Sequence, residues 1–141
     1  MKRILIVDDE PALRDGVAEL LRLEGYIVIT AADGRAAVAI VEGEDVGLVL
    51  MDVMMPHMNG LEAYGAMRAL PNGRSIPIVL ASAADHPGAL DPGVSVFLSK
   101  PFDFALLLDV VERLYHGPAG SNHEHAPATQ INDAQNGPVT K

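Results

Sequence analysis

The sequence contains no cysteine and no tryptophan, and lysine occurs only at Lys2, Lys100 and Lys141. Without cysteine, the chain can form no disulfide and can offer no thiolate as a nucleophile or metal ligand. Only 10 residues are basic against 19 acidic ones, and the formal net charge is -9. Because nucleic-acid binding normally depends on clustered Lys and Arg, we expect no direct contact with nucleic acid.

Long apolar runs are also missing. No run approaches the roughly 18 residues that a membrane span needs, and the first ten residues, MKRILIVDDE, become acidic too early for a signal peptide. We therefore expect a cytoplasmic protein without membrane contact. The 141 residues are enough for one domain with its own core.

Short β-type segments alternate with helical segments from residue 3 to about residue 115. The expected strands are residues 4–7, 26–30, 46–51, 76–81 and 94–98, and the expected helices are residues 11–23, 34–42, 59–69 and 102–115, with a short one near 86–91. Continuous apolar runs of this length are typical of strands covered on both faces. Five such units predict an α/β fold: a flavodoxin-like, doubly wound, five-stranded parallel sheet with strand order 2-1-3-4-5.

The composition changes after residue 116. Residues 117–141 include several Gly, Pro and Asn residues, one Ile and one Val, without any periodicity. Such a segment buries too little apolar area to offset its chain entropy. We therefore divide the chain into one domain, residues 1–116, and a disordered polar tail, residues 117–141.

Polar side chains follow four of the expected strands. Asp8 and Asp9 follow the first strand, Asp52 the third, Ser82 the fourth and Lys100 the fifth. Taken singly, such residues commonly cap helices or form turns. Together they meet at the carboxyl edge of the sheet. Clustered carboxylates favour a hard cation such as Mg²⁺, and a carboxylate beside a metal and an ammonium group can accept a phosphoryl group.

Four segments in this order resemble the receiver domain of bacterial two-component response regulators. They are IVDDE at 6–10, MDVMMPHMNG at 51–60, VLASA at 79–83 and KPF at 100–102. The resemblance covers residues 2 to about 116. It implies that Asp52 accepts a phosphoryl group from the phosphohistidine of a sensor histidine kinase or a histidine phosphotransfer protein. It also implies a signalling protein and not an enzyme, beyond self-phosphorylation and self-dephosphorylation.

The resemblance further implies a magnesium site. Asp8, Asp9 and Asp52 would hold the ion together with the backbone carbonyl of Met54.

A phosphorylation switch is implied as well. Ser82 would move toward the phosphoryl oxygen, Lys100 would contact it, and Phe97 would be the aromatic residue that turns inward. The Lys100–Pro101 peptide bond is expected to be cis. Phosphorylation would then favour one arrangement of the face that a downstream protein partner reads.

Two features depart from the resemblance. The segment between Ser82 and Lys100 is shorter, by about one helical turn, than the resemblance implies, and it contains Pro and Gly. We therefore expect the fourth helix to be short or distorted. Conversely, the helix expected at 102–115 is apolar over an arc of roughly 200°, wider than one core contact needs. Leu106 and Val110 on this arc are candidates for a partner or homodimer surface.

Three functions remain open at this point. A stand-alone receiver is the main interpretation, and a receiver fragment of a longer regulator, with its output domain missing, is the alternative. A phosphatase of the haloacid-dehalogenase type also combines an Asp nucleophile with Mg²⁺, Ser and Lys. That family needs a second acid two residues after the nucleophile, where this chain has Met54, so we disfavour it.

Overall fold

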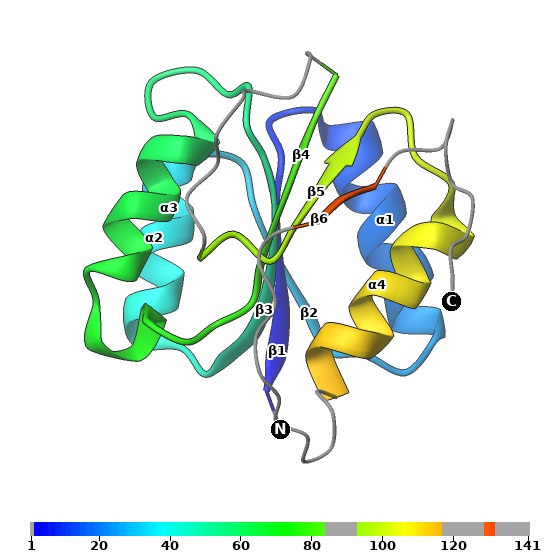
Figure 1. Ribbon diagram of the computed structural model, residues 1–141, viewed down its shortest axis with the longest axis horizontal. Helices are drawn as coiled ribbons and strands as arrows, with labels where there is room; N and C mark the ends of the chain where they lie inside the picture. Colours follow the sequence, from blue (N-terminus) through cyan, green and yellow to red (C-terminus); the bar gives the residue numbers. More distant parts are fainter. Residues whose placement is uncertain (1, 84–92, 117–128, 132–141) are drawn as a thin grey trace.

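The computed structural model describes residues 2–83, 93–116 and 129–131. Its strands form a single parallel sheet with the order β2-β1-β3-β4-β5-β6. Their bounds are β1 Arg3–Val7, β2 Val28–Ala31, β3 Val46–Asp52, β4 Ile78–Ser82, β5 Val96–Ser99 and β6 Thr129–Ile131. The predicted order 2-1-3-4-5 is therefore confirmed, and β6 extends the sheet beyond β5 (Figure 1).

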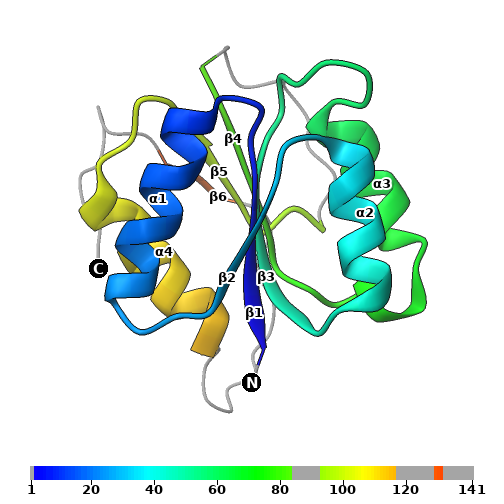
Figure 2. The same cartoon turned by 180° about the vertical axis from the view of Figure 1, so that it is seen from behind.

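The helices lie on both faces of the sheet. They are α1 Pro11–Leu23, α2 Gly34–Gly43, α3 Gly60–Arg68 and α4 Phe104–His116, with a short 3-10 turn at Pro71–Gly73. Seen from either side, α1 and α4 cover one face, and α2 and α3 cover the other (Figure 2). None of the helices in the described part of the chain has the length and hydropathy to cross a membrane.

Successive side chains along each strand point to opposite faces of the sheet and pack into two separate cores. Ile4 and Ile6 pack with Leu21 of α1 and Leu107 of α4 on one face, whereas Leu5 and Val7 pack on the other face with the buried residues of α2 and α3. Because both faces are covered, the strands are apolar at nearly every position. This arrangement is the physical reason for the continuous apolar runs in the sequence.

Local signals set the helix boundaries. Pro11 occupies the first turn of α1, where its missing N–H costs no hydrogen bond. The Asp33 side chain accepts a hydrogen bond from the Ala36 N–H and so caps α2. Asn59 and Glu62 form a reciprocal capping box at the start of α3.

Helix α4 buries more of its surface than the sequence analysis allowed. Val110 is only 3% exposed and belongs to the core shared with α1, so the prediction that it forms a partner surface is wrong. The wide apolar arc turns Val110 inward beside Leu107 and Val111, both fully buried. Leu106 is partly buried and packs against the same core, and its role in a partner surface stays a prediction.

Two predictions concern segments at the margins of the described structure. The short fourth helix expected near residues 86–91 lies outside the described residues. In the segment expected to be disordered, Thr129–Ile131 forms β6, which the sequence analysis did not predict. The rest of that segment lies outside the described residues.

Candidate functional site

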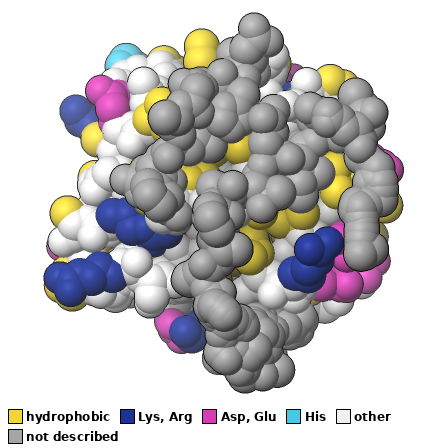
Figure 3. Space-filling view, viewed as in Figure 1, with side chains coloured by type: hydrophobic (Ala, Val, Ile, Leu, Met, Phe, Trp, Pro, Cys, Tyr) yellow, Lys and Arg dark blue, Asp and Glu magenta, His cyan; other side chains and the backbone are white. Residues whose placement is uncertain are grey.

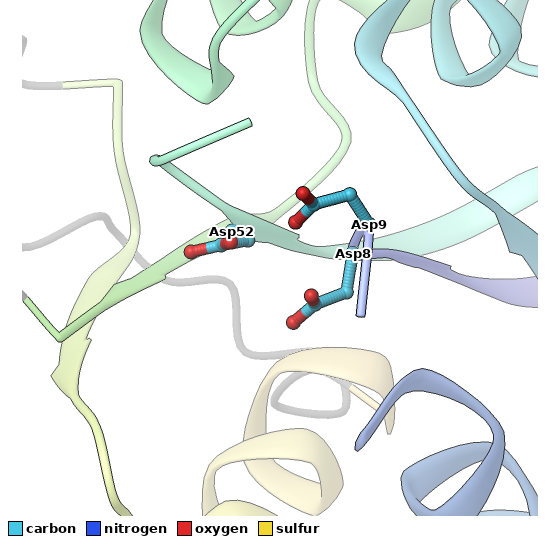
Figure 4. Close-up of side chains that lie close together, drawn as sticks. All are labelled: Asp8, Asp9 and Asp52. Atoms are coloured by element: carbon cyan, nitrogen blue, oxygen red, sulfur yellow. The ribbon is translucent and has the colours of Figure 1, made fainter. Parts of the chain in front are cut away.

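Three carboxylates meet at the carboxyl edge of the sheet. Asp8 and Asp9 follow the last residue of β1, and Asp52 is the last residue of the neighbouring strand β3. One carboxylate oxygen from each residue lies within 4.8 Å of those of the other two. Figure 4 shows the three side chains gathered beyond the strand ends. The structure therefore brings together the carboxylates that the sequence analysis assigned to one site.

Lys100 reaches this cluster from the end of β5. Its Nζ donates a hydrogen bond to Asp8 Oδ2 at 2.9 Å and lies 3.4 Å from Asp52 Oδ1. Its side chain is 16% exposed, while the Asp8 and Asp52 side chains are 8% and 7% exposed. Burial weakens solvent screening, so these ion pairs hold the three side chains in a fixed arrangement.

The electrostatics of Asp52 and Lys100 differ. Burial raises the pKa of Asp52 above its ordinary value. The charge of Lys100 lowers this pKa and the charge of Asp8 raises it, and the net shift is upward. For Lys100, burial alone would lower the pKa, but the hydrogen bond to Asp8 and the charge of Asp52 outweigh burial and raise the pKa. Lys100 thus remains a cation, and its charge only partly offsets the effect of burial on Asp52.

The carboxylate cluster fits a magnesium ion. All three side chains offer oxygen, the ligand type that Mg²⁺ prefers, and Asp9 is exposed, so the cluster opens toward solvent. Few protein ligands and an open side suit an ion that keeps several waters and also binds phosphate oxygens. Asp8, Asp9 and Asp52 are therefore positioned to bind Mg²⁺. The fourth predicted ligand, the Met54 carbonyl, stays a prediction.

The backbone around Asp52 is closely packed. The Met54 N–H donates to Asp52 Oδ1 at 3.3 Å, and the Gly60 N–H donates to the Val53 carbonyl at 2.8 Å. A Cβ on Gly60 would lie 2.5 Å from the Asp52 carbonyl oxygen. Any side chain at position 60 would therefore force the backbone to shift where the start of α3 returns to the end of β3.

The predicted switch residues lie beside the cluster. Ser82 ends β4 and is 2% exposed, and its carbonyl accepts a hydrogen bond from the Lys100 N–H at 2.9 Å. Phe97 is in the middle of β5 and is fully buried. The Lys100–Pro101 peptide bond is cis, as the resemblance implies. Phe97 is thus already turned inward in this structure, and the switching roles of Ser82, Lys100 and Phe97 remain predictions.

The sequence analysis missed Arg14. From α1, its Nη1 donates to the Asp8 carbonyl at 3.2 Å, and its Nε pairs with Asp15. The side chain is 17% exposed. Arg14 lies one helical turn after Glu10. This spacing was the one signal in the sequence that could have indicated a basic side chain close to the turn after β1.

The sequence matches the family model described as "Response regulator receiver domain" over residues 4–112. An uncharacterized 14.6 kDa protein from Leptolyngbya boryana is 37% identical over 78% of this chain and 87% of that protein. Response regulator MprA from Mycobacterium sp. (strain KMS) is 33% identical over 99% of this chain. The chain spans only 61% of the length of MprA.

Solved structures show the same fold. The receiver domain of sensor histidine kinase PA1611 from Pseudomonas aeruginosa PAO1, which has a magnesium ion in its active-site cleft, matches with a TM-score of 0.76 and 33% identity over 82% of this chain and 98% of that one. Response regulator TrrA from Thermotoga maritima, in complex with Mg(2+)-BeF, matches with a TM-score of 0.73 and 35% identity over 81% and 99%.

Proposed function

Since this chain belongs to the response regulator receiver family, we propose that Asp52 accepts a phosphoryl group from the phosphohistidine of a sensor histidine kinase or histidine phosphotransfer protein. The observation that carries the proposal is the position of the buried Asp52 carboxylate, 3.4 Å from Lys100 and beside Asp8 and Asp9. Asp8 is equally buried, but its Oδ2 already accepts a hydrogen bond from Lys100 Nζ at 2.9 Å, whereas Asp52 Oδ1 lies 3.4 Å from that nitrogen.

The reaction exchanges one bond to phosphorus for another. An oxygen of Asp52 attacks phosphorus while the phosphorus–nitrogen bond of the donor histidine breaks, and the imidazole leaves with the electron pair of that bond. Lys100 offsets negative charge on the phosphoryl oxygens. When bound, Mg²⁺ supplies further positive charge; Asp8, Asp9, Asp52 and the Met54 carbonyl hold it.

The switch acts through β4 and β5. The Ser82 hydroxyl moves toward the phosphoryl oxygen on Asp52, and Phe97 fills the space beside it. Support comes from the burial of both side chains and from the pairing of β4 with β5 in register, with Ser82 opposite Ser99. A downstream protein reads the altered surface of this end of the sheet.

The receiver acts in phosphorelay signalling in the cytoplasm, as a stand-alone regulator. The alternative is the receiver part of a longer regulator, because MprA extends beyond the matched region. The genomic reading frame beyond Lys141 distinguishes the two.

Leu106 on α4 contributes to a homodimer or partner surface. We expect Leu106→Asp to leave the fold intact and to weaken self-association in analytical ultracentrifugation. Unchanged folding and unchanged self-association in this variant would remove Leu106 from the proposal.

Incubation with acetyl phosphate and Mg²⁺, followed by intact mass spectrometry, tests the central step. We expect the wild type to gain the mass of one phosphoryl group, and Asp52→Asn or chelation of Mg²⁺ to abolish the gain. Asp45→Asn, which removes an exposed carboxylate at the opposite end of β3, is the matched control and should be phosphorylated normally. An unmodified wild type would contradict the proposal.

A further inference from the structure

The outer edge of β5 is occupied by a short segment that is distant in sequence. Strand β6, Thr129–Ile131, pairs with β5 in parallel and is the outermost strand of the sheet (Figure 1). We propose that this edge of β5 is a binding site for an extended peptide strand and that residues 129–131 of the same chain are its occupant. This inference does not depend on phosphorylation of Asp52.

The backbone of β5 has hydrogen-bonding groups available on this edge. The Ser95 N–H, immediately before β5, donates to the Ile78 carbonyl of β4 at 2.9 Å. Because successive N–H groups along a strand point to opposite sides, the N–H groups of Val96 and Leu98 face away from β4 and toward β6. An edge strand that presents such groups is a template for a further strand.

Buried side chains of β5 anchor this edge in the sheet. Phe97 and Leu98 are fully buried on opposite faces of the sheet, and Val96 is 8% exposed. These anchors hold β5 extended, so an incoming strand loses only its own conformational freedom. In the view of Figure 3, hydrophobic side chains are visible between the grey atoms in the middle and also along the outline, and charged side chains lie at the left, at the bottom and at the lower right.

The chain's connectivity favours its own segment as occupant. Parallel neighbours need a crossover of a dozen or more residues, and 29 residues including α4 connect Ser99 with Thr129. A tethered segment has an effective concentration on the order of millimolar. The occupant is short and uncharged, Thr-Gln-Ile, and three residues form few backbone hydrogen bonds. Its pairing is therefore reversible, and an extended uncharged peptide of similar length can compete with it.

Amide hydrogen exchange of the full-length chain, measured by NMR, tests the proposal. We expect protection of the Val96 and Leu98 amides in the wild type and loss of that protection in Gln130→Pro, because proline removes an N–H and does not fit within a strand. The Phe97 amide, which faces β4, should stay protected. Gln130→Ala is the matched control: it keeps the backbone N–H and should behave as the wild type does.

A competition experiment identifies the occupant. A peptide of residues 126–134 should restore the protection of Val96 and Leu98 in the Gln130→Pro protein, and the same peptide with proline at position 130 should not. Equal exchange of these two amides in the wild type and Gln130→Pro would overturn the proposal, with the Phe97 amide reporting whether the variant is folded. Protection that depends on protein concentration would assign the edge to a second copy and would also overturn it.

Discussion

Opposing electrostatic influences act on Asp52. Burial and the neighbouring Asp8 raise its pKa, Lys100 lowers it, and burial prevails. In the folded protein without metal, Asp52 therefore holds its proton more tightly than in the unfolded chain. Ionisation of Asp52 therefore lowers the free energy of unfolding. This loss develops as the pH rises from the ordinary carboxyl pKa of 3.8 through the raised pKa of Asp52 in the folded state.

Asp52→Asn should remove this cost. In the presence of a chelator, we expect the variant to unfold at a higher temperature than the wild type at neutral pH. The difference should shrink as pH falls below 3.8, because Asp52 is then protonated in both the folded and the unfolded state. Thermal unfolding of both proteins across this pH range measures the difference. A constant difference, or a less stable variant at neutral pH, would refute this account of Asp52.

Gly60 allows the close approach of α3 to the phosphoacceptor strand. In Gly60→Ala the added Cβ would meet the backbone of Asp52 and Val53 at 2.5 and 2.8 Å. We expect a loss of about 1–3 kcal/mol in the free energy of unfolding and slower phosphorylation, since Asp52 must shift.

Gly65→Ala is the matched control within α3. An added Cβ at Gly65 has no heavy atom within 4 Å, and alanine favours a helix interior by roughly 0.5–1 kcal/mol over glycine. Urea unfolding and phosphorylation rates of both variants are the measurements. Equal effects of the two substitutions would contradict the role given to Gly60.

At the level of single residues, the sequence predicted the charged cluster well, because strand ends in a parallel sheet meet at one edge. Asp8, Asp52 and Lys100 lie as expected. Val110 was misplaced because periodicity gives the direction of an apolar arc but not how much of it the sheet and α1 cover. Arg14 was missed because its partner is a backbone carbonyl, and the spacing from Glu10 does not by itself reveal that partner.

Arg68 connects α3 with the segments that lead into β4 and β5. Its guanidinium donates to the carbonyls of Gly73, Ile76 and Gly93 at 2.6 to 2.8 Å and lies over the Tyr64 ring. The planar, five-donor group of arginine suits three carbonyls on two separate segments, and a lysine ammonium does not.

Both Arg68→Lys and Arg68→Met should therefore destabilise the protein. We expect the methionine variant to lose about 3 kcal/mol in the free energy of unfolding, because a hydrogen bond to a charged group contributes roughly 1.5–3 kcal/mol and the losses of several such bonds are not additive. Arg113→Met is the control: Arg113 forms an exposed pair with Asp109, and its loss should cost no more than about 0.5 kcal/mol. Chemical denaturation gives both values. Similar costs for Arg68 and Arg113 would rule out the connecting role.

At the level of elements, sequence periodicity located the five main strands and four helices to within one or two residues at most boundaries. The expected strand 76–81, for example, is Ile78–Ser82, and the expected helix 11–23 is Pro11–Leu23. Strand β6 escaped prediction because three residues carry no periodicity and because its conformation depends on pairing with β5.

For the whole molecule, three of the 19 acidic residues, Asp8, Asp9 and Asp52, form the cluster at which Mg²⁺ should stabilise the fold. A ligand that binds only the folded state adds about 2.7 kcal/mol at 100 times its dissociation constant. We expect Mg²⁺ to raise the unfolding temperature of the wild type and to have little effect on Asp9→Asn, which loses an exposed ligand of the cluster.

The Asp9→Asn protein without metal should be as stable as the wild type without metal, because Asp9 is exposed. Asp45→Asn, which removes an exposed carboxylate at the opposite end of β3, should retain the full effect of Mg²⁺. Thermal unfolding with and without the ion measures these effects. An unreduced Mg²⁺ effect in Asp9→Asn would exclude Asp9 from the site.

The global topology followed from the sequence because right-handed crossovers and two covered faces leave few arrangements for five β/α units. The sheet order then determined which strand ends are neighbours and therefore which side chains meet at the site. Side-chain distances and the depth of burial depend on packing across the whole molecule and needed the structure.

The most direct measurement is the position of the acyl phosphate. Borohydride reduces an aspartyl phosphate to homoserine, which peptide mass spectrometry can locate after treatment of the full chain with acetyl phosphate and Mg²⁺. The account predicts homoserine at position 52 and at neither Asp8 nor Asp9. Homoserine at another position, or none in phosphorylated protein, would contradict it.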